Sequence, residues 1–127
     1  MNSKKLLIID DNEFYAKLLG QKFAEIKYEV SSCNDGIQGL DSATKNRYDL
    51  IILDLIMPGK DGFEVLEKLR QATLTHKTPI VVFSTLSQDE DVEKVKKLGA
   101  SGHVSKYGDS IENIIQKILA LANNEQV

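Results

Sequence analysis

An apolar run followed by a stretch with helical spacing occurs five times along this chain of 127 residues, and no other feature constrains the fold as strongly. Short apolar runs between polar residues predict strands, and apolar residues that recur every three or four positions predict amphipathic helices. The predicted strands are Leu6–Ile9, Tyr28–Cys33, Leu50–Leu53, Pro79–Phe83 and Ala100–Ser105. Strict alternation of strand and helix indicates a parallel sheet with helices on both faces.

The composition of the strands predicts their order in the sheet. The runs that begin at Leu6, Leu50 and Pro79 are apolar throughout, as central strands are, whereas the other two carry several polar residues, as edge strands do. The order 2-1-3-4-5 satisfies this with right-handed crossovers. We therefore predict an α/β fold, a doubly wound five-stranded parallel sheet with five helices, whose topological switch lies between the first and third strands.

The predicted helices carry apolar stripes and local start signals. The stripe of the first helix comprises Phe14, Leu18, Leu19, Phe23 and Ile26, and that of the second comprises Ile37, Leu40 and Ala43. Asn34 or Asp35 can cap the second helix, and the segments 61–64, 87–90 and 109–112 have the form of caps for the last three.

Three carboxylates are predicted to meet at the switch point. Asp10 and Asp11 follow the first strand and Asp54 follows the third, so all three lie at the carboxyl edge of the sheet. Like charges in one crevice would drive at least one acid towards protonation, unless a cation is present. Mg²⁺ (or Mn²⁺) is the hard divalent cation that suits such ligands. The alternative interpretation is that each aspartate only caps the helix that follows it.

Nucleotide and flavin sites are the other ligand classes that this topology hosts. A dinucleotide-binding fold would place glycines after the first strand, whereas the segment 10–13 here is acidic and would repel a pyrophosphate. The sequence also lacks a glycine-rich phosphate loop that ends in Lys followed by Ser or Thr. A flavin site remains compatible with the topology, but the acids make a poor seat for its phosphate.

A hydroxyl and an ammonium complete the predicted site. Ser84 follows the fourth strand and Lys106 follows the fifth, both at the edge where the acids lie. Either residue alone on a surface loop is usually only solvated. Together with the acids and a metal ion, they form a place to hold a phosphoryl group while a carboxylate attacks it.

Length and charge restrict the remaining possibilities. We expect one domain over 1–127, with residues 123–127 as a frayed tail, and no further output domain. A net charge of −3 argues against a nucleic-acid-binding surface. The N-terminal apolar run is too short for a signal peptide or a membrane span, and the single Cys33 excludes an intrachain disulfide, so we expect a cytoplasmic protein.

Taken in order, these motifs resemble the receiver domain of two-component response regulators of the chemotaxis-regulator type, which has a flavodoxin-like fold. The resemblance covers nearly the whole chain. It rests on Asp10-Asp11, on Asp54 with Met57-Pro58 and Asp61-Gly62, on the segment Pro79–Ser84, and on Gly99–Gly102 followed by Lys106.

The resemblance implies a role for each residue of the site. Asp54 would accept a phosphoryl group from a sensor histidine kinase or a phosphotransfer protein. Asp11, Asp54 and the carbonyl of Ile56 would bind Mg²⁺, with Asp10 acting through water. Lys106 and the Ser84 hydroxyl would hold phosphoryl oxygens.

The resemblance also implies a switch. The Ser84 hydroxyl would move towards the phosphoryl group and allow His103 to turn inward, which would remodel the face formed by the fourth helix, the fifth strand and the fifth helix. Tyr or Phe is usual where this chain has His103. A histidine can swing in the same way and add pH sensitivity. The alternative is an edge-strand histidine that only packs.

Two further departures from the family pattern concern the loops. Tyr107 stands where a proline usually follows the lysine, and a cis bond without proline costs about 3 kcal/mol. Ile56 and Leu86 are apolar at the two positions that flank the line of water attack on the acceptor. Neither side chain can orient a water, so we expect a comparatively long-lived phosphoryl-aspartate.

The predicted function is therefore a phosphorylation-dependent signalling switch rather than a turnover enzyme, with an unidentified protein as its downstream target. Two alternatives are a constitutive protein-binding module with the same fold and a metal-dependent phosphatase. The full set of acids, hydroxyl and lysine argues against the binding module. The lack of another aspartate two residues after Asp54 argues against the phosphatase.

Overall fold

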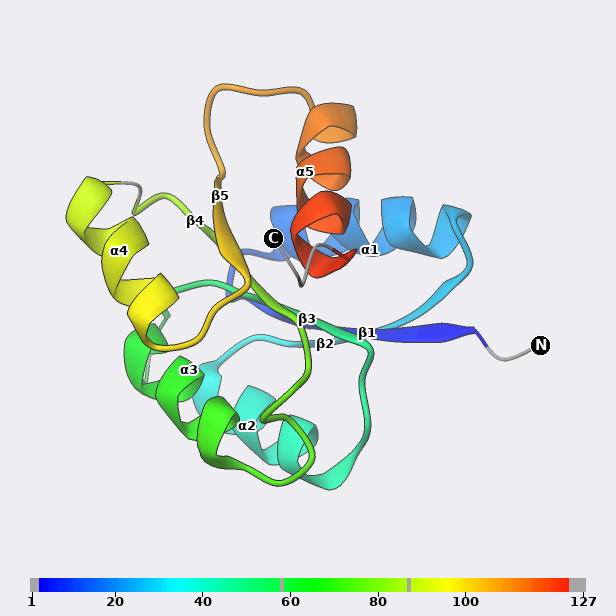
Figure 1. Cartoon of the computed structure of the whole chain (residues 1–127). Helices are drawn as coiled ribbons and strands as arrows, with labels where there is room; N and C mark the ends of the chain where they lie inside the picture. Colours follow the sequence, from blue (N-terminus) through cyan, green and yellow to red (C-terminus); the bar gives the residue numbers. More distant parts are fainter. Residues whose placement is uncertain (1–2, 58, 87, 124–127) are drawn as a thin grey trace.

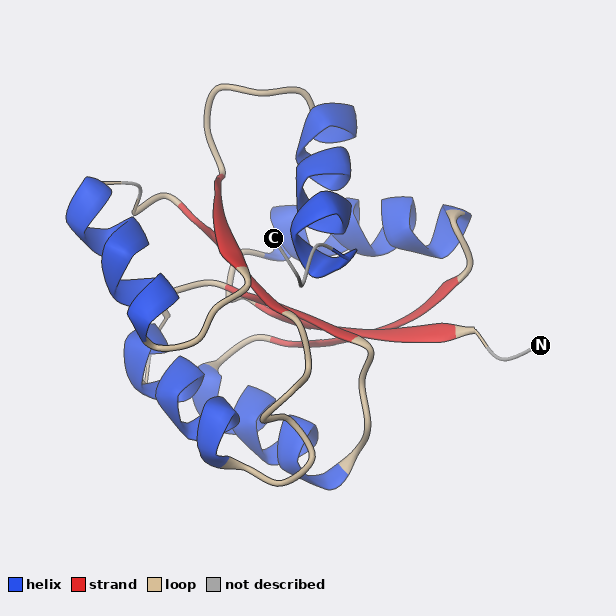
Figure 2. Cartoon of the chain, viewed as in Figure 1, coloured by secondary structure: helices blue, strands red, loops and turns tan. Residues whose placement is uncertain are grey.

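The computed structural model describes residues 3–57, 59–86 and 88–123, over which strands and helices alternate along the chain (Figures 1 and 2). The elements are β1 (Lys4–Ile9), α1 (Glu13–Glu25), β2 (Tyr28–Cys33), α2 (Gly36–Lys45), β3 (Leu50–Leu53), α3 (Gly62–Gln71), β4 (Ile80–Ser84), α4 (Asp89–Lys97), β5 (Gly102–Ser105) and α5 (Ile111–Asn123). Pro58, Ser87 and residues 124–127, which the sequence predictions used, lie outside the described residues.

The sheet has the order β2-β1-β3-β4-β5, and every neighbouring pair is parallel, so the predicted topology is confirmed. Its register matters for the site. Ile9 lies opposite Leu53, and the next residue in each strand is an aspartate. The backbone N–H of Asp54 donates to the Ile9 carbonyl at 2.9 Å. Asp10 and Asp54 therefore leave the sheet side by side at its carboxyl edge.

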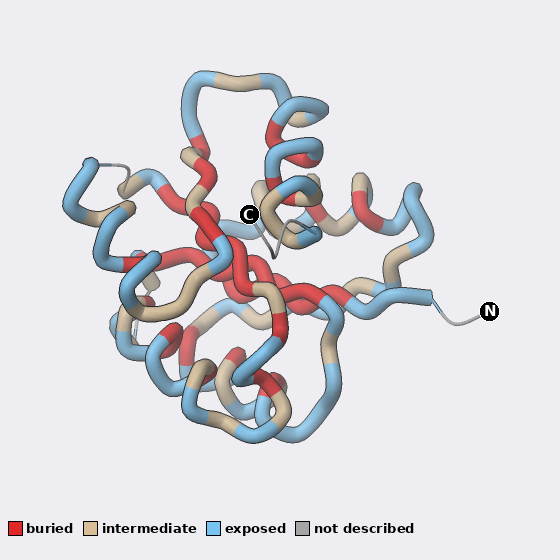
Figure 3. Tube along the Cα trace, in the orientation of Figure 1, coloured by how far each residue is buried: buried red, intermediate tan, exposed pale blue. Residues whose placement is uncertain are grey.

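Helices cover both faces of the sheet. Helices α1 and α5 lie on one face, and α2, α3 and α4 lie on the other (Figure 2). Alternate residues of the central strands enter two separate apolar clusters, Leu6 and Ile8 on the α1/α5 side and Leu7 and Ile9 on the other. The buried residues consequently follow the sheet through the middle of the molecule (Figure 3).

Local signals set where the helices begin and end. The side chains of Asn12, Asp35 and Asp61 accept hydrogen bonds from backbone N–H groups at the starts of α1, α2 and α3. At the start of α5 it is Ser110, rather than Asp109, whose hydroxyl accepts from a backbone N–H of the first turn. Gly99 follows α4 with a φ of +104°, a conformation that favours glycine.

Three residues of the predicted apolar stripes face solvent instead: Phe14 is 68% exposed, Ile26 45% and Ile37 58%. Phe14 lies about 140° around the helix axis from Leu19, which α1 buries. Ile26 lies at the end of α1, beyond its last turn. Helix α2 instead packs through Gly39, where a Cβ would come within 2.7 Å of the Ile9 side chain, and this turns Ile37 outwards. None of the described helices combines the length and the apolar character that crossing a bilayer requires.

Candidate functional site

Three carboxylates meet at the carboxyl edge of β1 and β3. Asp10, Asp11 and Asp54 each offer an oxygen, and these oxygens all lie within 4.8 Å of one another. Asp10 and Asp54 are buried, at 2% and 5% exposure, whereas Asp11 is exposed. The cluster is therefore withdrawn into the fold but reaches solvent through Asp11.

Asp10 is held by its own loop and by Lys106. Its Oδ1 accepts a hydrogen bond of 2.9 Å from the backbone N–H of Asn12. Its Oδ2 is buried and lies 2.8 Å from Lys106 Nζ in a charge-assisted ion pair. Burial raises the pKa of Asp10, which the Lys106 ammonium opposes and the Asp54 carboxylate reinforces. Oδ2 is thus a buried acceptor that still has the capacity to bind another ligand.

The Asp54 carboxylate lies between two donors. Its Oδ1 is 3.4 Å from the backbone nitrogen of Ile56, and its Oδ2 accepts a hydrogen bond of 3.3 Å from Lys106 Nζ. Ile56, two residues after Asp54, is 53% exposed, so an apolar side chain faces solvent in this loop. The side chain of this acceptor candidate is fixed by contacts with its own loop and with the residue that follows β5.

Lys106 follows β5 directly and is only 6% exposed. Its backbone N–H donates to the carbonyl of Ser84 at 3.1 Å, which carries the β4–β5 pairing one step further. Its ammonium lies 4.8 Å from the centre of the Tyr15 ring and 5.5 Å from that of Phe83, as well as against the acids. The peptide bond between Lys106 and Tyr107 is trans, as are the other described peptide bonds.

Ser84 and His103 meet at Leu86 rather than at the acids. Ser84 is fully buried, and its hydroxyl accepts a hydrogen bond of 3.2 Å from the Leu86 N–H. His103 is half-buried, and its Nε2 lies 2.5 Å from the Leu86 carbonyl. Because a carbonyl can only accept, Nε2 must carry the proton. The backbone of a single residue therefore joins the two predicted switch positions.

The residues present fit a hard divalent cation. Three carboxylates converge, one of them exposed to solvent, and the Lys106 ammonium is shared between the other two. Oxygen ligands of this number and charge are those that Mg²⁺ takes in proteins, together with water. The predicted Asp10, Asp11 and Asp54 are thus brought together, with Lys106 beside them.

Tyr15 and Phe83 are the contacts that the sequence predictions missed. Tyr15 lies in the first turn of α1, four residues after Asp11, so it stands above the same edge of the sheet. Its hydroxyl donates to the Lys106 carbonyl at 3.3 Å. The position of Tyr15, soon after the acidic pair, could have indicated that it lies near the site. The direction of its side chain, however, depends on how α1 packs on the sheet.

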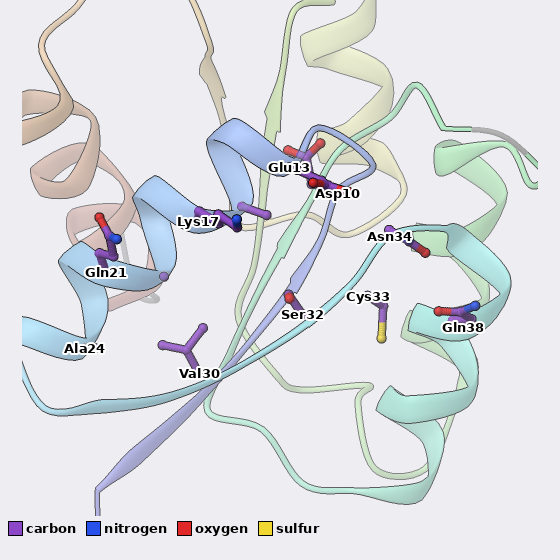
Figure 4. A pocket seen from close by; sticks show the side chains of 12 residues that line it. Asp10, Glu13, Lys17, Gln21, Ala24, Val30, Ser32, Cys33, Asn34 and Gln38 are labelled. Carbon is purple, nitrogen blue, oxygen red and sulfur yellow. The ribbon is translucent and has the colours of Figure 1, made fainter.

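A groove of about 600 Å³ runs from Asp10 along α1 and β2 (Figure 4). Asp10 and Glu13 lie at one end and Val30 lies at the other, with Gln38 of α2 at the rim (Figure 4). Asp11, Asp54 and Lys106 are not part of its lining, so the groove lies beside the acid cluster. Burial, with Asp35 and Asp41 nearby, raises the pKa of the Cys33 thiol in its wall, which makes that thiol a poor nucleophile.

Comparison with known proteins gives a consistent picture. Residues 6–119 match the family model of the response regulator receiver domain. The sporulation initiation phosphotransferase F of Bacillus subtilis is 31% identical over 126 residues, which cover 98% of this chain and 100% of that protein. Several other curated relatives are longer, and this chain spans 24%, 46% and 53% of three of them.

Two solved structures extend this to three dimensions. The chemotaxis response regulator CheY4 of Vibrio cholerae is 28% identical, with a TM-score of 0.87 over 94% of this chain and 99% of that one. The receiver domain of the sensor histidine kinase PA1611 of Pseudomonas aeruginosa, 25% identical, has a TM-score of 0.82 over 95% and 98% of the two chains. That structure has a magnesium ion coordinated in its active-site cleft. Because the family match spans most of its length and a relative above 30% identity aligns end to end, this chain belongs to the response regulator receiver domain family.

Proposed function

We propose that this receiver domain is a phosphorylation-dependent switch in which Asp54 accepts a phosphoryl group from the phosphohistidine of a sensor kinase or phosphotransfer protein. The observation that carries the proposal is the position of the Lys106 ammonium, 2.8 Å from Asp10 and 3.3 Å from Asp54, beside an exposed third carboxylate. A buried cation that is shared between two acids can exchange one of them for a phosphoryl oxygen without leaving the site.

The transfer step requires few groups. One carboxylate oxygen of Asp54 attacks phosphorus, the phosphorus–nitrogen bond of the donor breaks, and the departing imidazole takes a proton from solvent. Lys106 then neutralises charge on the transferred group. Asp11, Asp54 and the Ile56 carbonyl would hold Mg²⁺, with Asp10 acting through water. When bound, the ion neutralises phosphoryl oxygens.

The switch would act through Leu86. A Ser84 hydroxyl that turns to a phosphoryl oxygen must give up its hydrogen bond from the Leu86 N–H. That would free the segment that also holds His103. Among its described residues, helix α4, which follows this segment, buries only Val95, and the side chain of its N-cap residue Gln88 makes no capping hydrogen bond. An element with so few buried contacts moves at low cost, so the face of α4, β5 and α5 is the surface that a protein target would read.

Incubation with Mg²⁺ and a small acyl phosphate, followed by intact-protein mass spectrometry, tests the proposal. We expect one phosphoryl group on the wild type and none on Asp54→Asn. Asp41→Asn, which changes an exposed aspartate on α2, is the matched control and should be phosphorylated normally. Absence of phosphorylation of the wild type would instead favour a constitutive binding module. Sustained release of many phosphates per chain would favour a phosphatase.

The lifetime of the phosphoryl group is a separate prediction. The exposed apolar side chain of Ile56, next to Asp54, cannot orient an attacking water. Ile56→Asn would supply a polar group at that position and should speed phosphate release several-fold. Ile56→Val is the matched control, because it keeps the surface apolar. An unchanged release rate in the asparagine variant would contradict a role for Ile56.

A further inference from the structure

Tyr15 contacts both ends of Lys106, although the two residues are 91 positions apart in the chain. The Tyr15 hydroxyl donates to the Lys106 backbone carbonyl at 3.3 Å. The Tyr15 ring lies 4.8 Å from the Lys106 ammonium. The Tyr15 side chain thus contacts both the backbone and the ammonium group of Lys106.

Tyr15 is itself held in place by its buried aromatic neighbour Phe83. Its ring meets Phe83 edge-on, at 5.4 Å between centroids and 84° between planes, and it also meets Phe14 at 5.5 Å. Phe83 is fully buried and immediately precedes Ser84 in β4. Tyr15 is therefore a half-buried, well-supported side chain that joins α1 to the carboxyl ends of β4 and β5.

Lys106 requires such support. A lysine side chain is long and flexible, and its ammonium otherwise prefers water. The loop after Lys106 begins with Tyr107, which is 67% exposed, and continues with Gly108 at a φ of +85°. The Tyr107 N–H donates to the Ser105 hydroxyl at 3.1 Å, which is a contact within the same segment of chain. The Tyr15 hydroxyl and the Ser84 carbonyl tie the Lys106 backbone to α1 and to β4.

We propose that Tyr15 is a positioning residue for phosphoryl transfer, which holds the Lys106 ammonium over Asp54. This rests on the proposed function of Asp54 and Lys106. The negative face of the ring attracts the ammonium without fixing its direction. The ammonium can therefore shift from the carboxylates to a phosphoryl oxygen while it stays against the ring. The hydroxyl keeps the lysine backbone in register during that shift.

Three variants separate positioning from packing. Tyr15→Phe keeps the ring and removes only the hydrogen bond to the Lys106 carbonyl. Tyr15→Leu removes both the hydrogen bond and the aromatic face. Phe14→Leu, which changes the exposed neighbour of Tyr15, is the matched control, because Phe14 touches the Tyr15 ring.

The decisive measurement is the rate of phosphorylation by a small acyl phosphate, in the wild type and in a Lys106→Met background. We expect Tyr15→Leu to slow phosphorylation about tenfold when Lys106 is present, because the ring no longer attracts the ammonium in the transition state, and less than twofold when Lys106 is absent. Tyr15→Phe should retain most of the rate, and Phe14→Leu all of it. Mg²⁺ affinity, measured by calorimetry, should be unchanged in the Tyr15 variants.

The possible outcomes are distinguishable. Wild-type protein that takes up no phosphoryl group would overturn the proposed function and this inference together. Normal wild-type phosphorylation with an unchanged rate in Tyr15→Leu would overturn the inference alone. An equal slowing in both backgrounds would do the same, because it would mark Tyr15 as a packing residue. If Tyr15→Leu does not fold, Tyr15→Met, which also lacks the aromatic face, is measured in the same two backgrounds, and an unchanged rate or a loss that persists without Lys106 overturns the inference.

Discussion

Lys106 and Arg70 are cationic side chains shielded from solvent at opposite ends of β4 and β5, and they bind different kinds of partner. Lys106, at the carboxyl end of β5, lies between the carboxylates of Asp10 and Asp54. Arg70, on the last turn of α3, lies at the edge where β4 and β5 begin. Burial lowers the pKa of Arg70. Lys106 forms ion pairs with two carboxylates.

The partners of Arg70 are neutral. Its guanidinium donates to the backbone carbonyls of Gly99, Thr75 and Thr78, at 2.7, 2.9 and 2.6 Å. These bonds tie the loop before β4 to the loop before β5. A guanidinium bonded to three carbonyls has nothing to exchange, whereas an ammonium paired with anions can exchange one anion for another. The first arrangement holds structure and the second permits chemistry.

The largest expected difference between the two cations is in the phosphorylation rate. Lys106→Met should slow phosphorylation by a small acyl phosphate by about 10²- to 10³-fold, as the loss of a preorganised donor to transition-state charge does. Arg70→Met should change the rate less than twofold, when it is measured at a temperature where the variant is folded. Similar losses in the two variants would break the comparison, because the guanidinium would then also act on the site.

Stability should show the reverse pattern. Arg70→Met removes three hydrogen bonds to carbonyls, of which that of Thr75 still accepts from the Thr78 N–H, and should cost about 3 kcal/mol of unfolding free energy in urea titrations. Added Mg²⁺ should not restore it. Arg70→Lys should recover only part, because an ammonium lacks the planar fork.

The matched experiment on Lys106 uses the same titrations. Lys106→Met should also lose stability in a chelator, since two buried carboxylates then face each other uncompensated. Mg²⁺ should restore that loss, because the ion replaces the missing positive charge. A loss that is independent of Mg²⁺ would place Lys106 in the same class as Arg70.

The smallest effect concerns Asp10 in metal-free protein. Burial raises its pKa above the ordinary value of 3.8, so ionisation of Asp10 opposes folding. This penalty is absent below about pH 3.8 and develops as the pH rises through the folded-state pKa. Asp10→Asn should therefore be as stable as the wild type near pH 4 and about 1 kcal/mol more stable at pH 7 in a chelator.

The control for Asp10→Asn is Asp41→Asn, whose carboxylate pairs with Lys45 on the surface. It should change the unfolding free energy by less than about 0.5 kcal/mol at either pH. An Asp10→Asn variant that is less stable than the wild type at pH 7 would mean that the Lys106–Asp10 ion pair outweighs the cost of burial.

The sheet and the acid cluster could be predicted because they follow from chain order. Alternation and apolar content determine which strands are central, and parallel strands deliver Asp10 and Asp54 to one edge whatever the details of packing. The same reasoning correctly placed Lys106 beside them. Positions at strand ends are therefore the part of a site that sequence reasoning reaches best.

Side-chain directions could not be predicted in the same way. Phe14 and Tyr15 are adjacent aromatic residues on α1, yet the first faces solvent and the second contacts Lys106. Which of them turns inward depends on how the helix is rotated on the sheet, and that rotation is set by contacts of Leu19 and Phe23 with the core. The three carbonyls that bind Arg70 likewise belong to loops, and no local sequence pattern predicts that these loops come together.

Leu86 has a consequence for how information moves through the domain. Its N–H donates to the Ser84 hydroxyl and its carbonyl accepts from His103. Under the proposed function, phosphorylation at Asp54 and readout at the α4–β5–α5 face would both act through the backbone of this residue. A change in the Leu86 backbone could therefore uncouple Ser84 from His103 without altering either side chain. A receiver with an altered Leu86 backbone would still take its phosphoryl group and would keep its target face, but the two would no longer correspond. Under the proposed function, phosphorylation and recognition by a target are therefore separable properties of this domain.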